Sequence, residues 1–220
     1  MFKQGQLKSL GIATALIILN IAVMWIFAFT PLAAVNDLIF PPPQWKLFLG
    51  VIVYGAMLTG GVWLAKKGVR SGEKTMAAGG ASIIQLAYGM FGAGIIGMLP
   101  PSVQALALGI TGIVTTAIAV LSGLVVFGTG HDFSNWGRYA NYIFLSVLAV
   151  SFIGSFSGIF ALITFTLALI GFIVYLIHQI YVTKTRPGTP FLNGIGLYTA
   201  YMGVFVQILQ IVVEMLLGEE

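Results

Sequence analysis

The chain has 220 residues, of which 59% are hydrophobic and only 7% are charged, whereas roughly 25% of the residues in an ordinary soluble domain are charged. A soluble core of this size cannot bury so much apolar surface, so the composition excludes a soluble domain and indicates an integral membrane protein. The net charge of +4 does not indicate nucleic-acid binding, because the cations lie between apolar runs, and the lack of cysteine excludes disulfides and thiolate metal sites.

Seven apolar segments reach the length of about 20 residues that a membrane helix needs. The first follows a basic tip and is longer than the apolar part of a signal peptide, which predicts an uncleaved span. Cuts at charges, prolines and glycine-rich turns place the spans at about 8–30, 46–65, 75–98, 102–127, 136–156, 158–182 and 191–217. We therefore predict an all-α membrane protein with a single domain over residues 1–220, folded as a bundle of seven transmembrane helices.

The links between spans are short in two places and stiff in a third. Pro100 and Pro101 separate the third span from the fourth, and a few residues near Ser155 to Gly158 separate the fifth from the sixth. Both pairs of spans are therefore predicted to form antiparallel hairpins. The segment 31-PLAAVNDLIFPPPQW-45 contains a proline triplet that cannot be helical, which predicts a polyproline II segment across the surface.

The positive charges are distributed unequally between the two sets of loops. If the N-terminus is cytoplasmic, the cytoplasmic segments contain nine cations and the opposite side contains only Lys46. The nine are Lys3, Lys8, Lys66, Lys67, Arg70, Lys74, Arg138, Lys184 and Arg186. Because cytoplasmic loops are enriched in lysine and arginine, this bias predicts a cytoplasmic N-terminus and a C-terminus, with Glu219 and Glu220, on the opposite side.

Four spans contain stripes of small or polar residues at alternating spacings of three and four. Lipid is as apolar as leucine, so membrane helices associate through small residues and interhelical hydrogen bonds, and these stripes predict the packed faces. The third span has Ala78, Ser82, Gln85, Gly89 and Gly92, and the fourth has Gly109, Gly112, Thr116, Ala119 and Gly123. The sixth has Thr164, Ala168, Gly171, Tyr175 and His178, and the seventh has Asn193, Gly196, Ala200, Gly203, Gln207, Gln210 and Glu214.

Within these stripes, the expected helix-packing positions are Gly89, Gly92, Gly171, Gly196, Ala200 and Gly203. The glycine-rich third span fits either close packing or a deformable helix that hinges, since each glycine weakens a helix by roughly 1 kcal/mol.

The pattern places His178 on the inward face of the sixth span. An ionisable residue there is either a functional group or a neutral imidazole bonded to a carbonyl or a tyrosine, for which Tyr198 and Tyr201 lie at a similar depth. Glu214 is either a further inward group or a boundary residue at the membrane surface. The residues expected to line an ion or proton pathway are His178, Tyr175, Tyr198, Tyr201, Gln207, Gln210 and Glu214.

The sequence lacks the motifs of enzymes, metal sites and cofactor sites. It contains no phosphate loop, dinucleotide-binding glycine motif or zinc-protease motif. His131 and His178 are isolated, and two histidines without cysteines or nearby carboxylates do not form a zinc site. We expect no catalytic residues, no metal and no cofactor.

The segment 129-TGHDFSNWGRYANYIFLSVLAVSFIGSF-156 resembles the signature of the Bax inhibitor family (transmembrane BAX inhibitor motif proteins). In that family a short loop leads into the fifth span, and the matching residues here are Thr129, Asp132, Phe133, Ser134 and Gly137. The end of the chain is similar too, over residues 175–180 and at Leu197, Tyr198, Phe205 and Leu209. The resemblance covers about 75–217 and implies seven spans and a cytoplasmic N-terminus, as in bacterial members.

Asp132 and Ser134 have a local role that does not depend on the resemblance. Either side chain can cap the N-terminus of the fifth span by accepting a hydrogen bond from a free amide. Asp132 also favours the positive end of the helix dipole.

The chain departs from the family at two inward positions. Several members have an aspartate in the sixth span and another in the seventh, a proton-sensitive pair linked to calcium leak, and the resemblance aligns these with His178 and Ala200. A histidine that faces an alanine cannot attract a divalent cation as two carboxylates do. It becomes cationic on acidification and repels calcium.

Two functions remain open on the sequence. The first is a family-like leak or channel for protons or cations, with a role in homeostasis. The second is an accessory subunit, or an assembly or quality-control factor, of a larger membrane protein complex. Its partners would be other membrane subunits or a membrane protease, besides the lipid bilayer, and not nucleic acid. The expected location is a bacterial inner membrane or, alternatively, an endoplasmic-reticulum-type membrane.

Overall fold

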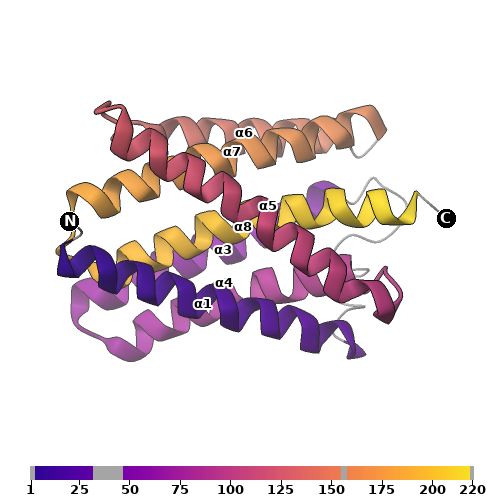
Figure 1. Ribbon diagram of the computed structural model, residues 1–220, viewed down its shortest axis with the longest axis horizontal. Helices are drawn as coiled ribbons and strands as arrows, with labels where there is room; N and C mark the ends of the chain where they lie inside the picture. Colours follow the sequence, from indigo (N-terminus) through magenta and orange to yellow (C-terminus); the bar gives the residue numbers. More distant parts are fainter. Residues whose placement is uncertain (1–2, 32–46, 155–157, 219–220) are drawn as a thin grey trace.

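The computed structural model describes residues 3–31, 47–154 and 158–218, and over these ranges the chain is all helical. Figure 1 shows the seven helices of this part of the chain. They are α1 (Gln4–Ala28), α3 (Leu47–Ser71), α4 (Lys74–Ile96), α5 (Pro101–Gly128), α6 (Trp136–Gly154), α7 (Gly158–Thr185) and α8 (Pro190–Leu217).

Six of these helices, all except α6, are long and apolar enough to cross a membrane. This confirms the prediction of an all-α integral membrane protein. Helix α6 has 19 residues, and its first two turns contain Arg138 and Asn141, which lower its mean hydropathy.

The helices follow the predicted segments except at several ends. Helix α3 continues to Ser71, six residues past the predicted limit, because Lys66, Lys67 and Arg70 are good helix formers even where the chain leaves the apolar layer. The predicted polyproline segment, Lys46, the link around 155–157 and the last two glutamates lie outside the described residues.

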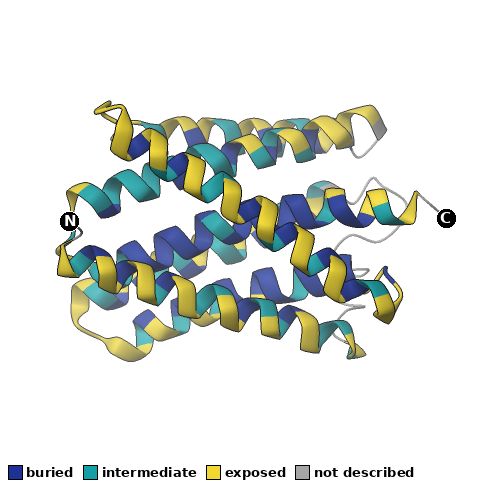
Figure 2. Ribbon diagram, viewed as in Figure 1, coloured by how far each residue is buried: buried dark blue, intermediate teal, exposed yellow. Residues whose placement is uncertain are grey.

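Helix α8 is the centre of the bundle. It packs against α1, α7, α5, α4 and α3, and Figure 2 shows it buried over most of its length. Most of its residues are apolar or small, and such a helix can be surrounded by others. Large side chains such as Tyr198, Met202 and Phe205 fill the space on one side, while glycines on the opposite side let α7 approach closely.

Helices α3 and α4 form a hairpin with a glycine seam. A Cβ on Gly80 would overlap the backbone of Ala65 and Gly61, and a Cβ on Gly68 would overlap the backbone of Ala77. The missing side chains let the two backbones touch, as expected for helices that associate by packing in lipid.

Helix α4 also packs closely on α1. The position of a Cβ on Gly89 is 2.8 Å from Val23, and that on Gly92 is 2.5 Å from the sulfur of Met24. Helix α4 runs without a break from Lys74 to Ile96. Its glycines therefore allow close packing, and the helix is not unwound at them.

A buried pair of amides joins α1 to α4. Asn20, which is 0% exposed, donates to the backbone carbonyl of Gln85 at 2.8 Å and to its side-chain oxygen at 2.7 Å. The Gln85 amide donates in return to the carbonyl of Leu16 at 2.8 Å. These bonds fix the register of two helices whose other contacts are apolar.

The prediction that the third and fourth spans pack together as a hairpin is wrong, because α4 and α5 do not pack along one another. Pro100 is extended, at φ −54° and ψ 142°, and sends the chain from the end of α4 into α5. Helix α5 then crosses the bundle diagonally (Figure 1) and packs on α8 and α7 rather than along α4. The hairpin between α6 and α7 is observed as predicted.

The packed face of α5 also differs from the predicted stripe. A Cβ on Gly109, Gly112 or Gly123 would meet no atom within 4 Å. The buried face is shifted from the predicted stripe by about one residue toward the N-terminus of the helix. It consists of Gln104, Ala107, Thr111, Thr115, Ser122 and Val126. Both rows have helical spacing and small or polar members, so spacing alone could not separate them.

Candidate functional site

A cavity of about 1190 Å³ lies between the α3–α4 hairpin and the α6–α7 hairpin, with α8 as its floor. At one end its wall includes Lys66 of α3, Ser134 and Asn135 of the loop before α6, and Arg138 of α6, all exposed. This is the end of the bundle where the chain begins (Figure 1). The cavity therefore opens at the N-terminal end of the bundle.

The cavity extends deep along the helices. On α8 its lining includes Gln207, which lies about 26 Å from the start of that helix at 1.5 Å per residue. A bilayer core is about 30 Å thick. Near the other end of the bundle, the Phe48 ring of α3 meets the Phe152 ring of α6 edge to face, at 5.3 Å between centroids. The two helices that flank the cavity are thus in contact at that end.

The lining is apolar with a few amides and cations. Lys66 and Arg138 are its lysine and arginine, and none of the described lining residues is an aspartate or a glutamate. The polar groups deeper inside are Asn141, Thr164, Tyr175, His178, Gln179, Thr199 and Gln207. The charged residues of the described lining are therefore the two cations at the mouth, and Asp132 lies at its edge, bonded to the amide of Ser134.

His178 lines this cavity and is held by a hydrogen bond. Its Nδ1 lies 3.0 Å from the backbone carbonyl of Phe133, and because a carbonyl only accepts, the proton sits on Nδ1. In the neutral ring Nε2 then has a free lone pair. The ring stacks beside Tyr175 with centroids 6.5 Å apart. His178 thus combines features of both alternatives. Its hydrogen bond to a carbonyl is what a structural imidazole would have, and its position in the cavity lining is what a functional group would have.

Gly137 makes room for this imidazole. A Cβ at Gly137 would lie 2.6 Å from Nε2 of His178. The glycine of the loop signature and the histidine of the sixth span are therefore a fitted pair across α6 and α7.

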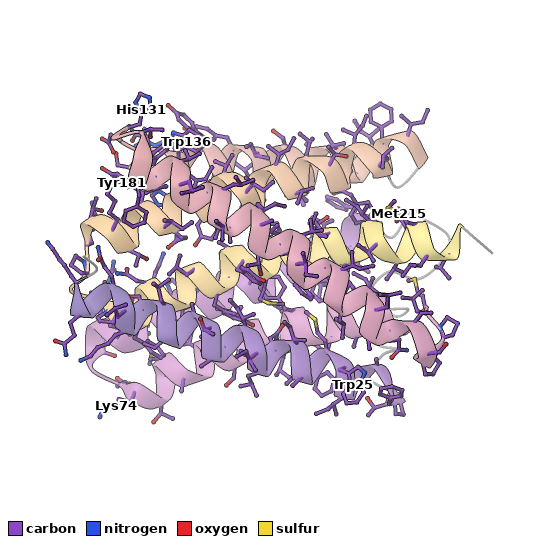
Figure 3. All side chains as sticks on the ribbon, viewed as in Figure 1. Trp25, Lys74, His131, Trp136, Tyr181 and Met215 are labelled. Atoms are coloured by element: carbon purple, nitrogen blue, oxygen red, sulfur yellow. The ribbon has the colours of Figure 1, made fainter. Side chains whose placement is uncertain are left out.

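The loop before α6 is anchored by the aromatic ring of Phe133, which is 3% exposed. Its ring packs edge-on against Trp136 at 4.9 Å and Tyr181 at 5.9 Å between centroids. Figure 3 shows Trp136 and Tyr181 at the same end of the α6–α7 pair, with His131 beyond them.

Asp132 stabilises the same loop, but not as a cap on the first turn of α6. Its Oδ1 accepts from the amide of Ser134 at 2.8 Å, two residues before the helix begins at Trp136. Hydrogen bonds from the Ser134 amide, the Ser134 hydroxyl and the Tyr181 hydroxyl lower the pKa of Asp132 below its ordinary value.

The lowered pKa gives a testable pH dependence. A depressed carboxyl pKa contributes stability above the ordinary value, and this contribution is lost as the pH falls through the lower, folded value. We expect Asp132→Asn to lower the midpoint of thermal unfolding near pH 7, with the difference from the parent closing as the pH falls through the lowered pKa of Asp132. The group is exposed, so the effect is small. A midpoint difference that persists unchanged in acid would contradict the role of the ionised carboxylate.

Several residues predicted for the pathway lie elsewhere. The Tyr201 hydroxyl is 3.0 Å from that of Thr116 on α5. Tyr198 is fully buried with its ring against Tyr88, so neither tyrosine is the partner of His178. Gln210 donates to the exposed Glu214 at 3.1 Å, and neither residue lines the cavity. Glu214 is thus not an inward group of the cavity.

The small residues of α7 and α8 lie beside the cavity. Gly203 packs against the Phe172 ring, Gly196 against the Gln179 amide, and Gly171 is 2.8 Å, measured from a built Cβ, from Phe144. Ala200 is 0% exposed. They bring α6, α7 and α8 close enough to form the wall.

The sequence reasoning missed the role of the cations at the mouth. The sequence predicts Lys66 and Arg138 only as cations of the cytoplasmic segments, although Lys66 ends one apolar run and Arg138 begins another on the face that the cavity uses. Gln179, next to His178 in the chain, also lines the cavity. A search for cations that share a helix face with inward glycines and amides could have found them.

No family model, no curated protein and no solved structure matches this chain.

Proposed function

We propose that the protein is a seven-span membrane protein of the Bax inhibitor type that provides a proton leak through this cavity. In this proposal all seven helices cross the membrane, the N-terminal end is cytoplasmic, and the membrane is a bacterial inner membrane. The observation that supports it is the depth of the cavity, which reaches Gln207 from the mouth at Lys66 and Arg138. The cations at that end agree with a cytoplasmic mouth.

The lining favours protons over divalent cations. A calcium site requires six to eight oxygen ligands, usually including carboxylates. The described wall contains no carboxylate. The positive mouth further disfavours divalent cations. His178 supplies a titratable ring nitrogen inside the cavity, at the position that the family resemblance links to ion leak.

The test uses purified protein in liposomes with an imposed pH gradient and a pH-sensitive dye inside. We expect the protein to dissipate the gradient faster than empty liposomes, and His178→Ala to slow this several-fold. His178→Asn is the sharper variant, because its amide can still donate to the Phe133 carbonyl but cannot bind a proton. The matched control is His131→Ala, which changes an exposed histidine outside the cavity.

Each outcome has a consequence. Dissipation by His178→Asn at the parent rate would show that the imidazole is not the proton site. A parent protein that never exceeds the empty-liposome rate contradicts the leak itself. If such a protein also purified with a stable partner, the accessory-subunit function would replace the leak.

A further inference from the structure

The cavity is also open to the side, between α3 and α6. Trp63 on α3 and Leu145 on α6 both line it, and their side chains are 60% and 62% exposed. These helices meet through Phe48 and Phe152 near their other ends, and the residues that line the opening lie on the N-terminal side of that contact. In a membrane, a gap of this kind faces the lipid of one leaflet. We call it the α3–α6 cleft.

The chemistry of the α3–α6 cleft changes along its length. At the N-terminal end it presents Lys66, Arg138, Ser134 and Asn135, all exposed. Further in, the flanking helices present mainly apolar residues, over about three turns of α3 and a little more than one turn of α6. They include Ile52, Leu58 and Val62 of α3, and Phe144, Leu145 and Leu148 of α6, with Thr59 and Asn141 as the polar exceptions.

This order of groups matches an amphiphile with a negative head and an apolar tail. Lysine and arginine pair with phosphate oxygens. The described lining itself contains no carboxylate, and Asp132 at its edge is engaged by the amide of Ser134. Basic sites between membrane helices on the cytoplasmic side are suited to anionic head groups. The volume of about 1190 Å³ also exceeds the roughly 300–1,000 Å³ of ordinary small-molecule pockets.

We propose that the α3–α6 cleft binds one anionic phospholipid from the leaflet at the N-terminal end of the bundle. Its phosphate lies between Lys66 and Arg138, and an acyl chain lies along the apolar walls of α3 and α6. The proposal requires that the helices cross the membrane with this end at the head groups. It does not require that the protein conduct protons, so the two proposals fail separately.

The test is native mass spectrometry of the purified full chain in detergent, with phosphatidylglycerol and phosphatidylcholine added in equal amounts. We expect one phosphatidylglycerol to be retained in preference to phosphatidylcholine. The double variant Lys66→Gln with Arg138→Gln is expected to lose this preference by about tenfold or more, since each cation near a head group contributes to anionic-lipid binding. The charge-matched control is Arg70→Gln with Lys74→Gln, which removes two cations at the same end that do not line the cavity.

Four results would overturn the proposal. Equal losses in both double variants would mean that general surface charge attracts the lipid. Equal retention of the two lipids would mean that the phosphate is not recognised. Release of the lipid by inorganic phosphate alone would indicate a site for a free anion, and a dimer that excludes lipid would indicate that a second copy fills the cleft.

Discussion

Gly80→Ala is expected to lower the free energy of unfolding by about 3 kcal/mol, at the upper end of the range for overpacking. A Cβ at this position would overlap the backbone nitrogen of Ala65 and the carbonyl of Gly61. Backbone atoms cannot rotate away as a side chain can, so α3 and α4 must separate. The loss is measured by denaturant titration of the protein in detergent micelles.

The neighbouring glycine is the matched control. A Cβ on Gly79 would have its nearest contact at 3.9 Å, the Cδ2 of Leu64. Gly79→Ala is therefore expected to be neutral or to stabilise α4 by up to about 1 kcal/mol, through helix propensity. Equal losses at Gly79 and Gly80 would show that α4 needs flexible glycine and not a close approach, which contradicts the packed seam.

Gly137→Ala is expected to lower the free energy of unfolding by about 1–3 kcal/mol, because the added methyl group overlaps the His178 ring. The Cβ would lie 2.6 Å from Nε2 and 2.8 Å from Cδ2 of His178. The ring cannot move aside without stretching its bond to the Phe133 carbonyl. We expect a lower unfolding midpoint and faster proteolytic cleavage of the loop before α6.

A double variant separates this clash from other causes. His178→Ala removes the ring that Gly137→Ala would strike, so the two changes together should destabilise the protein less than the sum of the single changes. Gly128→Ala serves as the control, since a Cβ there would meet no atom within 4 Å. Additive losses in the double variant would show that the glycine and the histidine are not a fitted pair.

Much of the fold could be predicted from the sequence, because six of the seven described helices are long and apolar and their ends coincide with prolines, charges or polar links. The inward faces of α7 and α8 followed from their small and polar stripes near Gly203 and Gln207. The same reasoning failed on α5, which has two candidate rows. The choice between them depends on the direction in which Pro100 sends the helix, which no local pattern encodes.

The site could be predicted only in part for a similar reason. The inward position of His178 followed from periodicity, but its partner is the backbone carbonyl of Phe133, 45 residues away. Any residue supplies a carbonyl, so the sequence could not identify this bond. The opening between α3 and α6 likewise depends on the orientation in which the α3–α4 and α6–α7 hairpins pack against α8, which the sequence of one helix does not predict.

The most direct test of the account is the accessibility of Gln207 from the N-terminal end of the bundle. The chain has no cysteine, so a single introduced cysteine can be followed with a membrane-impermeant thiol reagent in sealed vesicles of known orientation. We predict that Gln207→Cys is labelled from the side that bears Lys66 and Arg138, whereas Gln210→Cys, one turn further along α8, is labelled only from the opposite side. Failure to label Gln207→Cys from the Lys66 side, or its labelling only from the opposite side, would contradict the cavity on which the proposed function rests.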